Sequence, residues 1–184
     1  MGNDPEYPLI GLQLNLGGAS KRRSSASSDQ VLRDSISVHV RRYLICQYLK
    51  QSIIPDPAFI ALQDKFNDVD VAEIREALQQ RRTSSCATYK RAVSDGNVQK
   101  EAALLYDENV LVYDDETLLA QDDFLNREEA NAETLLKRFE GGLFLHKPSK
   151  QFIVAISYHG ENNGSTHENR KESIRGLLNG LYID

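Results

Sequence analysis

Short apolar runs separated by polar turns dominate this sequence, and three stretches with helical spacing interrupt them. The apolar runs indicate strands at residues 9–14, 59–63, 87–93, 101–106, 110–113, 142–146 and 151–157. The last two flank a polar turn at 147–150, a pattern that predicts a hairpin. The helical spacing predicts helices at residues 29–51, 69–82 and 168–181.

Each predicted helix has one apolar side that we expect to face the core. In the first helix the apolar positions are Leu32, Ile36, Val40, Tyr43, Leu44 and Tyr48, and in the second they are Val71, Ile74, Ala77 and Leu78. Strand, helix, strand and helix follow one another in the first half of the chain, and the second half is richer in strands. This order favours a layered α/β fold, and 184 residues suit one domain.

Composition and charge narrow the function classes. The net charge of −5 argues against a general nucleic-acid coat protein. No apolar run reaches the roughly 20 residues of a membrane helix, and no secretory signal is visible, so we expect an intracellular protein, cytoplasmic or nuclear. Two cysteines form no disulfide framework, and we expect Cys46 to be buried in the first helix. His39 and His146 are expected at the surface.

Candidate chemistry lies where apolar strands begin or end. Asn15 ends the first strand, Asp64 follows the second, Glu101 opens another, and His159 follows the last. An amide, two carboxylates and an imidazole are the groups needed to hold a divalent metal and move a proton at a phosphodiester.

Each of these residues also has an ordinary structural explanation. Asn15 could be a turn residue, since glycines follow it closely. Asp64 could form an ion pair or a cap near Lys65, and Glu101 could be a solvated charge at a strand edge. His159 precedes a glycine and could be a plain loop histidine.

The order of these motifs resembles the endonuclease/exonuclease/phosphatase superfamily, with spacing closest to its deoxyribonuclease I-like members. The matching segments are the strand ending in Asn15, the Leu62-Gln63-Asp64 strand end, Lys100-Glu101, Lys137-Arg138-Phe139-Glu140, and the strand leading to His159. The resemblance covers nearly all of residues 1–184, as a single domain, but only the N-terminal part of the family domain. It implies part of a four-layer α/β sandwich, with mostly antiparallel sheets flanked by helices and with the C-terminal part missing.

The resemblance also implies roles for five residues. Asn15 would orient the scissile phosphate, and Arg138 would contact it with its planar guanidinium. Asp64 stands where the family usually has Glu, the main ligand of a catalytic Mg²⁺, for which Mn²⁺ can substitute. His159 would be the general acid, and Glu101 would orient its ring. The implied partner is a phosphodiester substrate: DNA, RNA, an inositol phosphate or a lipid phosphodiester.

Two later motifs of the family, an Asp-x-Asn pair and a terminal Asp-His pair, have no match in this sequence. We therefore expect a truncated Mg²⁺-dependent phosphodiester hydrolase, an endonuclease-like enzyme if complete and nearly inactive as given. We also expect the inner face of the first sheet to be an exposed apolar surface, which a partner chain completing the second sheet could cover. The alternatives are a non-catalytic binding or regulatory homologue of the same fold, or an unrelated α/β domain.

Overall fold

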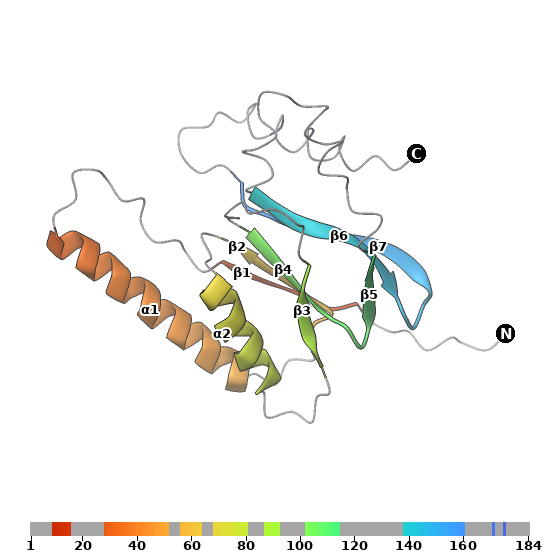
Figure 1. Ribbon diagram of the computed structural model, residues 1–184, viewed down its shortest axis with the longest axis horizontal. Coiled ribbons are helices and arrows are strands. Elements are labelled where there is room, and N and C mark those ends of the chain that lie inside the picture. The colour runs from red at the N-terminus through yellow and green to blue at the C-terminus, as the bar shows by residue number, and fades with distance from the viewer. Residues whose placement is uncertain are drawn as a thin grey trace.

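The computed structural model describes residues 9–15, 28–51, 56–63, 68–80, 87–92, 102–114 and 138–160, together with Lys171 and Arg175. Its elements, in chain order, are β1 (Gly11–Asn15), α1 (Ser28–Gln51), β2 (Phe59–Gln63), α2 (Asp68–Gln79), β3 (Tyr89–Arg91), β4 (Ala102–Asp107), β5 (Leu111–Asp114), β6 (Phe139–His146) and β7 (Gln151–Tyr158) (Figure 1). The predicted helix at 168–181 lies largely outside the described residues.

The strands form two sheets, and antiparallel pairing predominates. One sheet has the order β1-β2-β4-β3, in which only β1 and β2 run parallel. The other has the order β5-β6-β7, with β6 and β7 joined by the predicted hairpin. The mixed α/β class with mostly antiparallel sheets is therefore confirmed.

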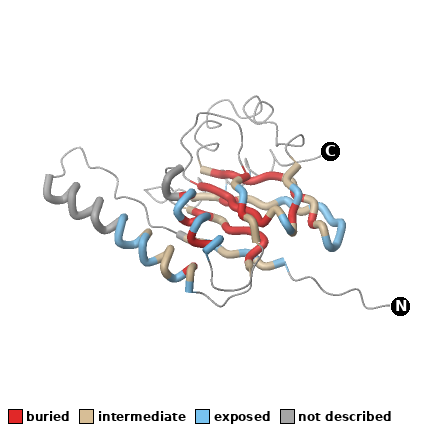
Figure 2. The backbone as a smooth tube through the Cα atoms, turned by 60° about the horizontal axis from the view of Figure 1, so that its bottom comes forward, coloured by how far each residue is buried: buried red, intermediate tan, exposed pale blue. Residues whose placement is uncertain are grey.

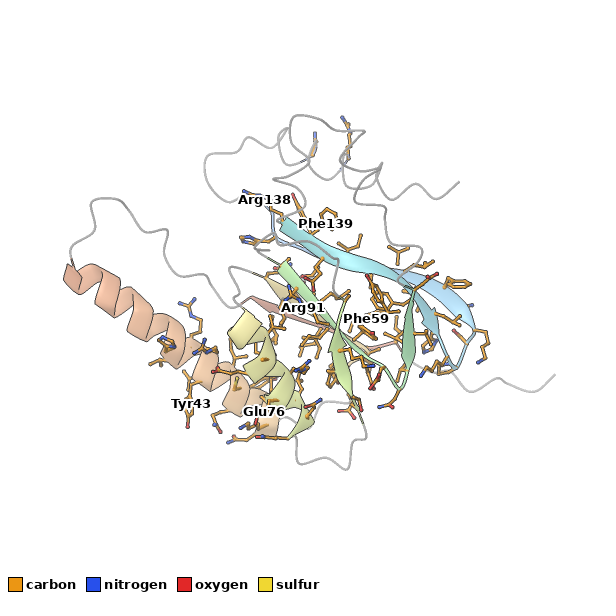
Figure 3. All side chains as sticks on the ribbon, in the orientation of Figure 1. Tyr43, Phe59, Glu76, Arg91, Arg138 and Phe139 are labelled. Atoms are coloured by element: carbon orange, nitrogen blue, oxygen red, sulfur yellow. The ribbon has the colours of Figure 1, made fainter. Side chains whose placement is uncertain are left out.

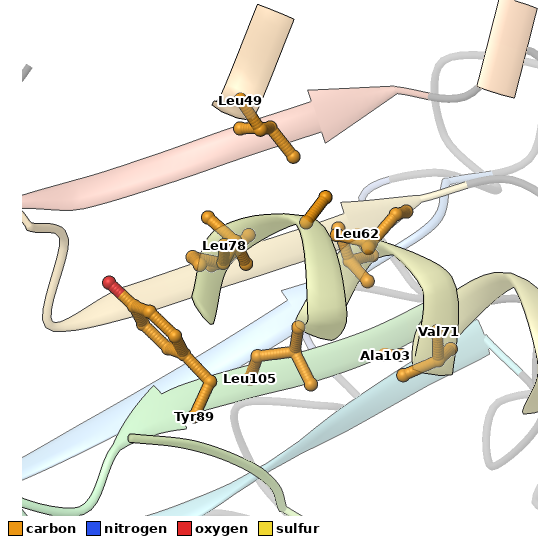
Figure 4. Close-up of a cluster of buried hydrophobic side chains, with 10 residues drawn as sticks. Leu49, Leu62, Val71, Leu78, Tyr89, Ala103 and Leu105 are labelled. Carbon is orange, nitrogen blue, oxygen red and sulfur yellow. The ribbon is translucent and has the colours of Figure 1, made fainter. Parts of the chain in front are cut away.

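The described elements lie in three layers: helices, the four-stranded sheet and the three-stranded sheet. One face of the four-stranded sheet packs against the helices (Figure 4), and the core there consists of Leu49, Ile60, Leu62, Val71, Ile74, Ala77, Leu78, Tyr89, Ala103 and Leu105. In α2 the apolar positions predicted to face inward are all buried. Their spacing of three and four residues places them on one side of the helix.

A second core lies between the two sheets. Phe59 and Tyr106 of the four-stranded sheet contact Phe144 of β6, each with ring centroids 5.2 Å apart. Leu104 is also buried in this cluster. The expectation that this inner face would be exposed is therefore wrong for these residues, because the three-stranded sheet covers them (Figure 2).

The first helix packs in a different orientation from the predicted one. Leu49 is buried, and Ile45 and Cys46 pack against the core only in part. The predicted inward positions described in this helix are instead exposed: Val40 by 51%, Tyr43 by 62%, Leu44 by 59% and Tyr48 by 59%. Figure 3 shows Tyr43 on the side of α1 away from the sheets. The apolar stripe predicted for α1 therefore faces solvent where it is described.

The two histidines assigned to the surface differ in their environments. His39 is exposed, as expected. His146 is buried, which corrects the prediction, and its Nδ1 lies 2.7 Å from the Ser149 hydroxyl in the hairpin turn. In the part of the chain that the structure describes, no helix has the length and apolar character to span a membrane.

Candidate functional site

Three strand ends of the four-stranded sheet meet in one row. Asn15 at the end of β1 is the register partner of Gln63 at the end of β2. Gln63 is in turn the register partner of Ala102, the first residue of β4. In sequence, Asp64 follows Gln63 and Glu101 precedes Ala102, and both lie outside the described residues.

The three-stranded sheet contributes the residues on the other side of the edge. The amide of His159 donates a hydrogen bond to the Arg138 carbonyl, with an N···O distance of 2.7 Å. This bond joins the start of β6 to the end of β7, next to the Phe139–Tyr158 register pair. Figure 3 labels Arg138 and Phe139 at this end of β6. Arg138 and His159 are therefore neighbours across β6 and β7.

Gln63 joins the two sheets at this edge. Its side-chain amide donates to the Tyr158 carbonyl at 2.9 Å, one residue before His159. Its side-chain oxygen accepts a hydrogen bond from Gln13 of β1 at 3.0 Å. The Ser157 hydroxyl donates to the Leu62 carbonyl at 2.8 Å, and both of these atoms are buried. The end of β7 is thus fixed against the end of β2 by two hydrogen bonds.

A buried ion pair supports the same part of the sandwich from the interior. The side chain of Glu140 is 1% exposed and lies 2.7 Å from Arg91 Nη2 and 2.9 Å from its Nε. Its Oε1 also accepts a hydrogen bond from the Leu104 amide at 3.0 Å. Glu140 is the register partner of Ser157, so it ties β6 to β3 and β4 close to the candidate site.

The structure tests the five predicted site residues to different degrees. For Asn15 it describes the backbone only, and Asp64 and Glu101 lie outside the described residues. Arg138 and His159 are both half-buried. The Nε2 atom of His159 is buried from solvent. The roles of Asn15, Asp64 and Glu101, including the contact of Glu101 with His159, therefore stay predictions.

Sequence reasoning missed the residues that hold the edge together. Gln63 and Ser157 bond to backbone carbonyls 95 positions away in the chain. A glutamine and a serine at strand ends are too common to signal such bonds. Glu140 stands in the sequence Lys137-Arg138-Phe139-Glu140, in which its charged neighbours suggest a surface position. Nothing in the local sequence therefore indicates that its carboxylate is buried.

Within the ranges that the structure describes, no three His, Cys, Asp or Glu side chains cluster to hold a metal ion. The expected ligand Asp64 is outside those ranges. The described groups at this edge include the Gln63 side-chain amide and backbone carbonyl oxygens. Mg²⁺ prefers oxygen donors and is often held by one or two carboxylates with several waters. By the chemistry of their oxygen donors, the Asp64 carboxylate and the Asn15 amide would fit such a site.

Comparison with protein-family models, with curated proteins and with solved structures finds no match to this chain. The functional assignment accordingly rests on the residues and on their arrangement.

Proposed function

We propose that this chain contributes part of a Mg²⁺-dependent phosphodiester-hydrolysing site at the edge where β1, β2, β4 and β7 end or begin. The observation that carries the proposal is the convergence of strand ends far apart in sequence. Asn15, Gln63 and Ala102 share one register row, and the Gln63 side chain bonds to Tyr158 beside His159.

Each residue has a chemical task in this proposal. Asn15 and Arg138 bind the phosphate, the first through its amide and the second through its fork of N–H donors. His159 donates a proton to the leaving oxygen, and Glu101 orients the imidazole. Asp64 holds Mg²⁺, which when bound neutralises developing negative charge on the phosphate. Asp is one carbon–carbon bond shorter than the Glu of the resembling family, a reach difference of about 1.5 Å.

The substrate class is a phosphodiester, with DNA, RNA, inositol phosphates and lipid phosphodiesters as the candidates. An intracellular site of action, cytoplasmic or nuclear, belongs to the same proposal and is supported by the absence of a disulfide framework in the sequence. The chain alone is expected to turn over slowly at best, because the residues that would activate water in the family have no match in this sequence.

One observation favours a second candidate, a non-catalytic binding or regulatory homologue of the same fold. The Nε2 atom of His159 is buried, whereas a general acid must bring a ring nitrogen within hydrogen-bond reach of the leaving oxygen. Protonation through Nε2 would require the groups covering it to move. In a homologue without hydrolase activity, His159 would not have to reach a leaving oxygen, and its Nε2 atom could stay buried.

Metal binding separates the two candidates without requiring turnover. Thermal unfolding of the chain is measured with and without millimolar Mg²⁺, and the same titration is followed by amide NMR signals. An ion at ten times its dissociation constant stabilises the folded state by about 1.4 kcal/mol. The Asp64→Ala variant should lose this stabilisation. The control is Asp56→Ala, which removes a carboxylate just before the opposite end of β2.

If Mg²⁺ stabilises the wild type and Asp56→Ala but not Asp64→Ala, the proposed metal site is supported. If Mg²⁺ leaves the wild type unchanged, the hydrolase proposal fails and the regulatory candidate stands. If both variants respond like the wild type, the ion binds elsewhere and Asp64 has no metal role.

A further inference from the structure

The outer strand of the three-stranded sheet combines features that soluble proteins usually avoid. β7 pairs with β6 through eight consecutive residue pairs, with no slip in register, and it pairs with no other described strand. Its sequence from Gln151 to Tyr158 contains no charged residue, no proline and no glycine. Edge strands are normally protected by charge, proline, a bulge or shortness, because open backbone groups invite pairing with another chain.

The outward face of β7 is also apolar. Phe152 is 65% exposed and Val154 is 46% exposed, and Val112 on β5 is 45% exposed on the same sheet. Ile153 and Ala155 contact the core between the sheets, so Phe152 and Val154 point to the opposite face. An uncharged strand with these side chains pairs readily with another strand of its own kind.

We propose that β7 pairs antiparallel with β7 of a second copy of this chain, joining two three-stranded sheets into one of six strands. A second copy suits this edge because the strand carries no charge, so two identical strands meet without like charges opposite one another. A two-fold contact also covers both open edges at once and closes the assembly.

Hydrogen-bond directions in β7 determine which residues take part. The His159 amide points toward β6, since it donates to the Arg138 carbonyl. Backbone groups alternate in direction along an antiparallel strand. The N–H and C=O groups of Phe152, Val154, Ile156 and Tyr158 therefore point away from β6, to the edge with which no other described strand pairs.

Gln63 selects one register from those available. It already donates to the Tyr158 carbonyl, so the pairing should use the other three outward residues. A two-fold axis at Val154 meets this condition: Val154 lies opposite Val154 of the second copy, and Phe152 lies opposite Ile156. An axis at Ala155 would place Phe152 opposite Tyr158 and compete with Gln63 for the same carbonyl.

This register has a consequence for the candidate site, which rests on the proposed function. It sets the hairpin turn of one copy beside the end of β7 in the other. Lys150, exposed in that turn, would then lie beside Tyr158 of its neighbour, next to His159. The second copy would add a cation to an edge proposed to bind a phosphodiester.

The test is the mass of the full chain in solution, measured by sedimentation equilibrium from micromolar to near-millimolar concentration. We expect a species of twice the 20.7 kDa of the chain. Val154→Lys should return it to the monomer by placing two like charges opposite each other. Val112→Lys is the matched control, since Val112 has nearly the same exposure on the same sheet but lies on β5. It should leave the dimer intact.

Hydrogen exchange of the wild type gives a second readout that needs no variant. The amides of Phe152, Val154 and Ile156 should gain protection as the concentration rises through the dimerisation range. A monomer at every concentration, an open-ended series of larger species, or dissociation by Leu44→Lys on α1 in place of Val154→Lys would overturn the proposal. These outcomes are independent of Mg²⁺, so failure of the dimer and failure of the hydrolase proposal are distinguishable.

Discussion

Among the described residues, the ion pair between Arg91 and Glu140 should be one of the most costly interactions to break. Glu140 is 1% exposed and its carboxylate bonds to two nitrogens of Arg91 and to the Leu104 amide. Removing one partner of a buried pair leaves an uncompensated charge and costs roughly 3–5 kcal/mol. The side chain of Arg91 is 23% exposed, so water can partly replace it. We therefore expect Arg91→Met to cost about 3 kcal/mol.

The two substitutions at Glu140 separate the charge from the hydrogen bond. Glu140→Gln keeps an oxygen that can accept from the Leu104 amide, and it should cost about 2 kcal/mol. Glu140→Ala also leaves that amide without its acceptor, which adds roughly 1–3 kcal/mol. The double variant Arg91→Met/Glu140→Gln should be less destabilised than the sum of its singles by about 2 kcal/mol, because the second substitution removes the charge stranded by the first.

Urea unfolding at neutral pH measures these free energies, provided that its slope is the same for all variants. Lys90→Met is the control, since Lys90 is the neighbouring residue in β3 and its ion pair with Glu108 is exposed. It should not shift the midpoint measurably. Additive effects of the two single substitutions, or an Arg91→Met variant as stable as Lys90→Met, would refute the argument that this pair is a coupled buried unit.

Two further predictions concern α1. Leu49→Ala should cost roughly 2–5 kcal/mol in urea unfolding, because Leu49 is 1% exposed. Leu44→Ala should stay within about 0.5 kcal/mol, because Leu44 is 59% exposed. A larger cost for Leu44→Ala than for Leu49→Ala would mean that the helix packs by its predicted stripe. Burial raises the pKa of the Cys46 thiol above its ordinary value of 9.0, and the charge of Glu73 raises it further. In a Cys86→Ser background, the rate of Cys46 alkylation by iodoacetamide should therefore rise with pH, with a midpoint above 9.0. Because the folded state then holds the proton more tightly than the unfolded state, stability should fall as pH rises from 9.0 through that midpoint, and Glu73→Gln should lower the midpoint; an unchanged midpoint would remove Glu73 as a cause.

The sequence predicted the strands well because their signal is local. β2 has its predicted bounds, and β4 and β7 differ from theirs by one residue at each affected end. β3 is two residues shorter than predicted at each end, and β6 begins three residues earlier than predicted. Strands of this kind either alternate apolar and polar residues or are apolar throughout, so the period and length of the apolar run are enough to find them. The fold class followed from their order.

The orientation of α1 could not be read in the same way. Its spacing indicates an apolar stripe through Val40, Leu44 and Tyr48, but spacing cannot say that a neighbour lies against that stripe. In the structure α1 contacts α2 with another side, where Arg42 forms an ion pair with Glu73 at 2.8 Å. A long arginine can pack its apolar stem while its charged end is paired. A search for apolar periodicity counts Arg42 as polar and therefore does not predict that its side of the helix packs against α2.

The candidate site was predictable to the extent that it consists of strand ends. A polar residue after an apolar run marks the edge of a sheet, and parallel or antiparallel neighbours bring several edges together. What holds the edges in place was not predictable, because Gln63 and Ser157 act through carbonyls on the opposite sheet. The position of a side chain across a sandwich depends on how two sheets are aligned, which no local pattern encodes.

Gln63 connects the candidate site with the proposed dimer. Its amide holds the Tyr158 carbonyl and so fixes the end of β7 where His159 begins. The same bond removes that carbonyl from the open edge and limits strand pairing to residues nearer the hairpin. A partner strand can therefore pair with β7 as far as Ile156, so that only the hairpin turn of the second copy, with Lys150, lies beside the His159 end. One side chain from the four-stranded sheet thus separates two uses of a single strand, pairing along its middle and chemistry at its end.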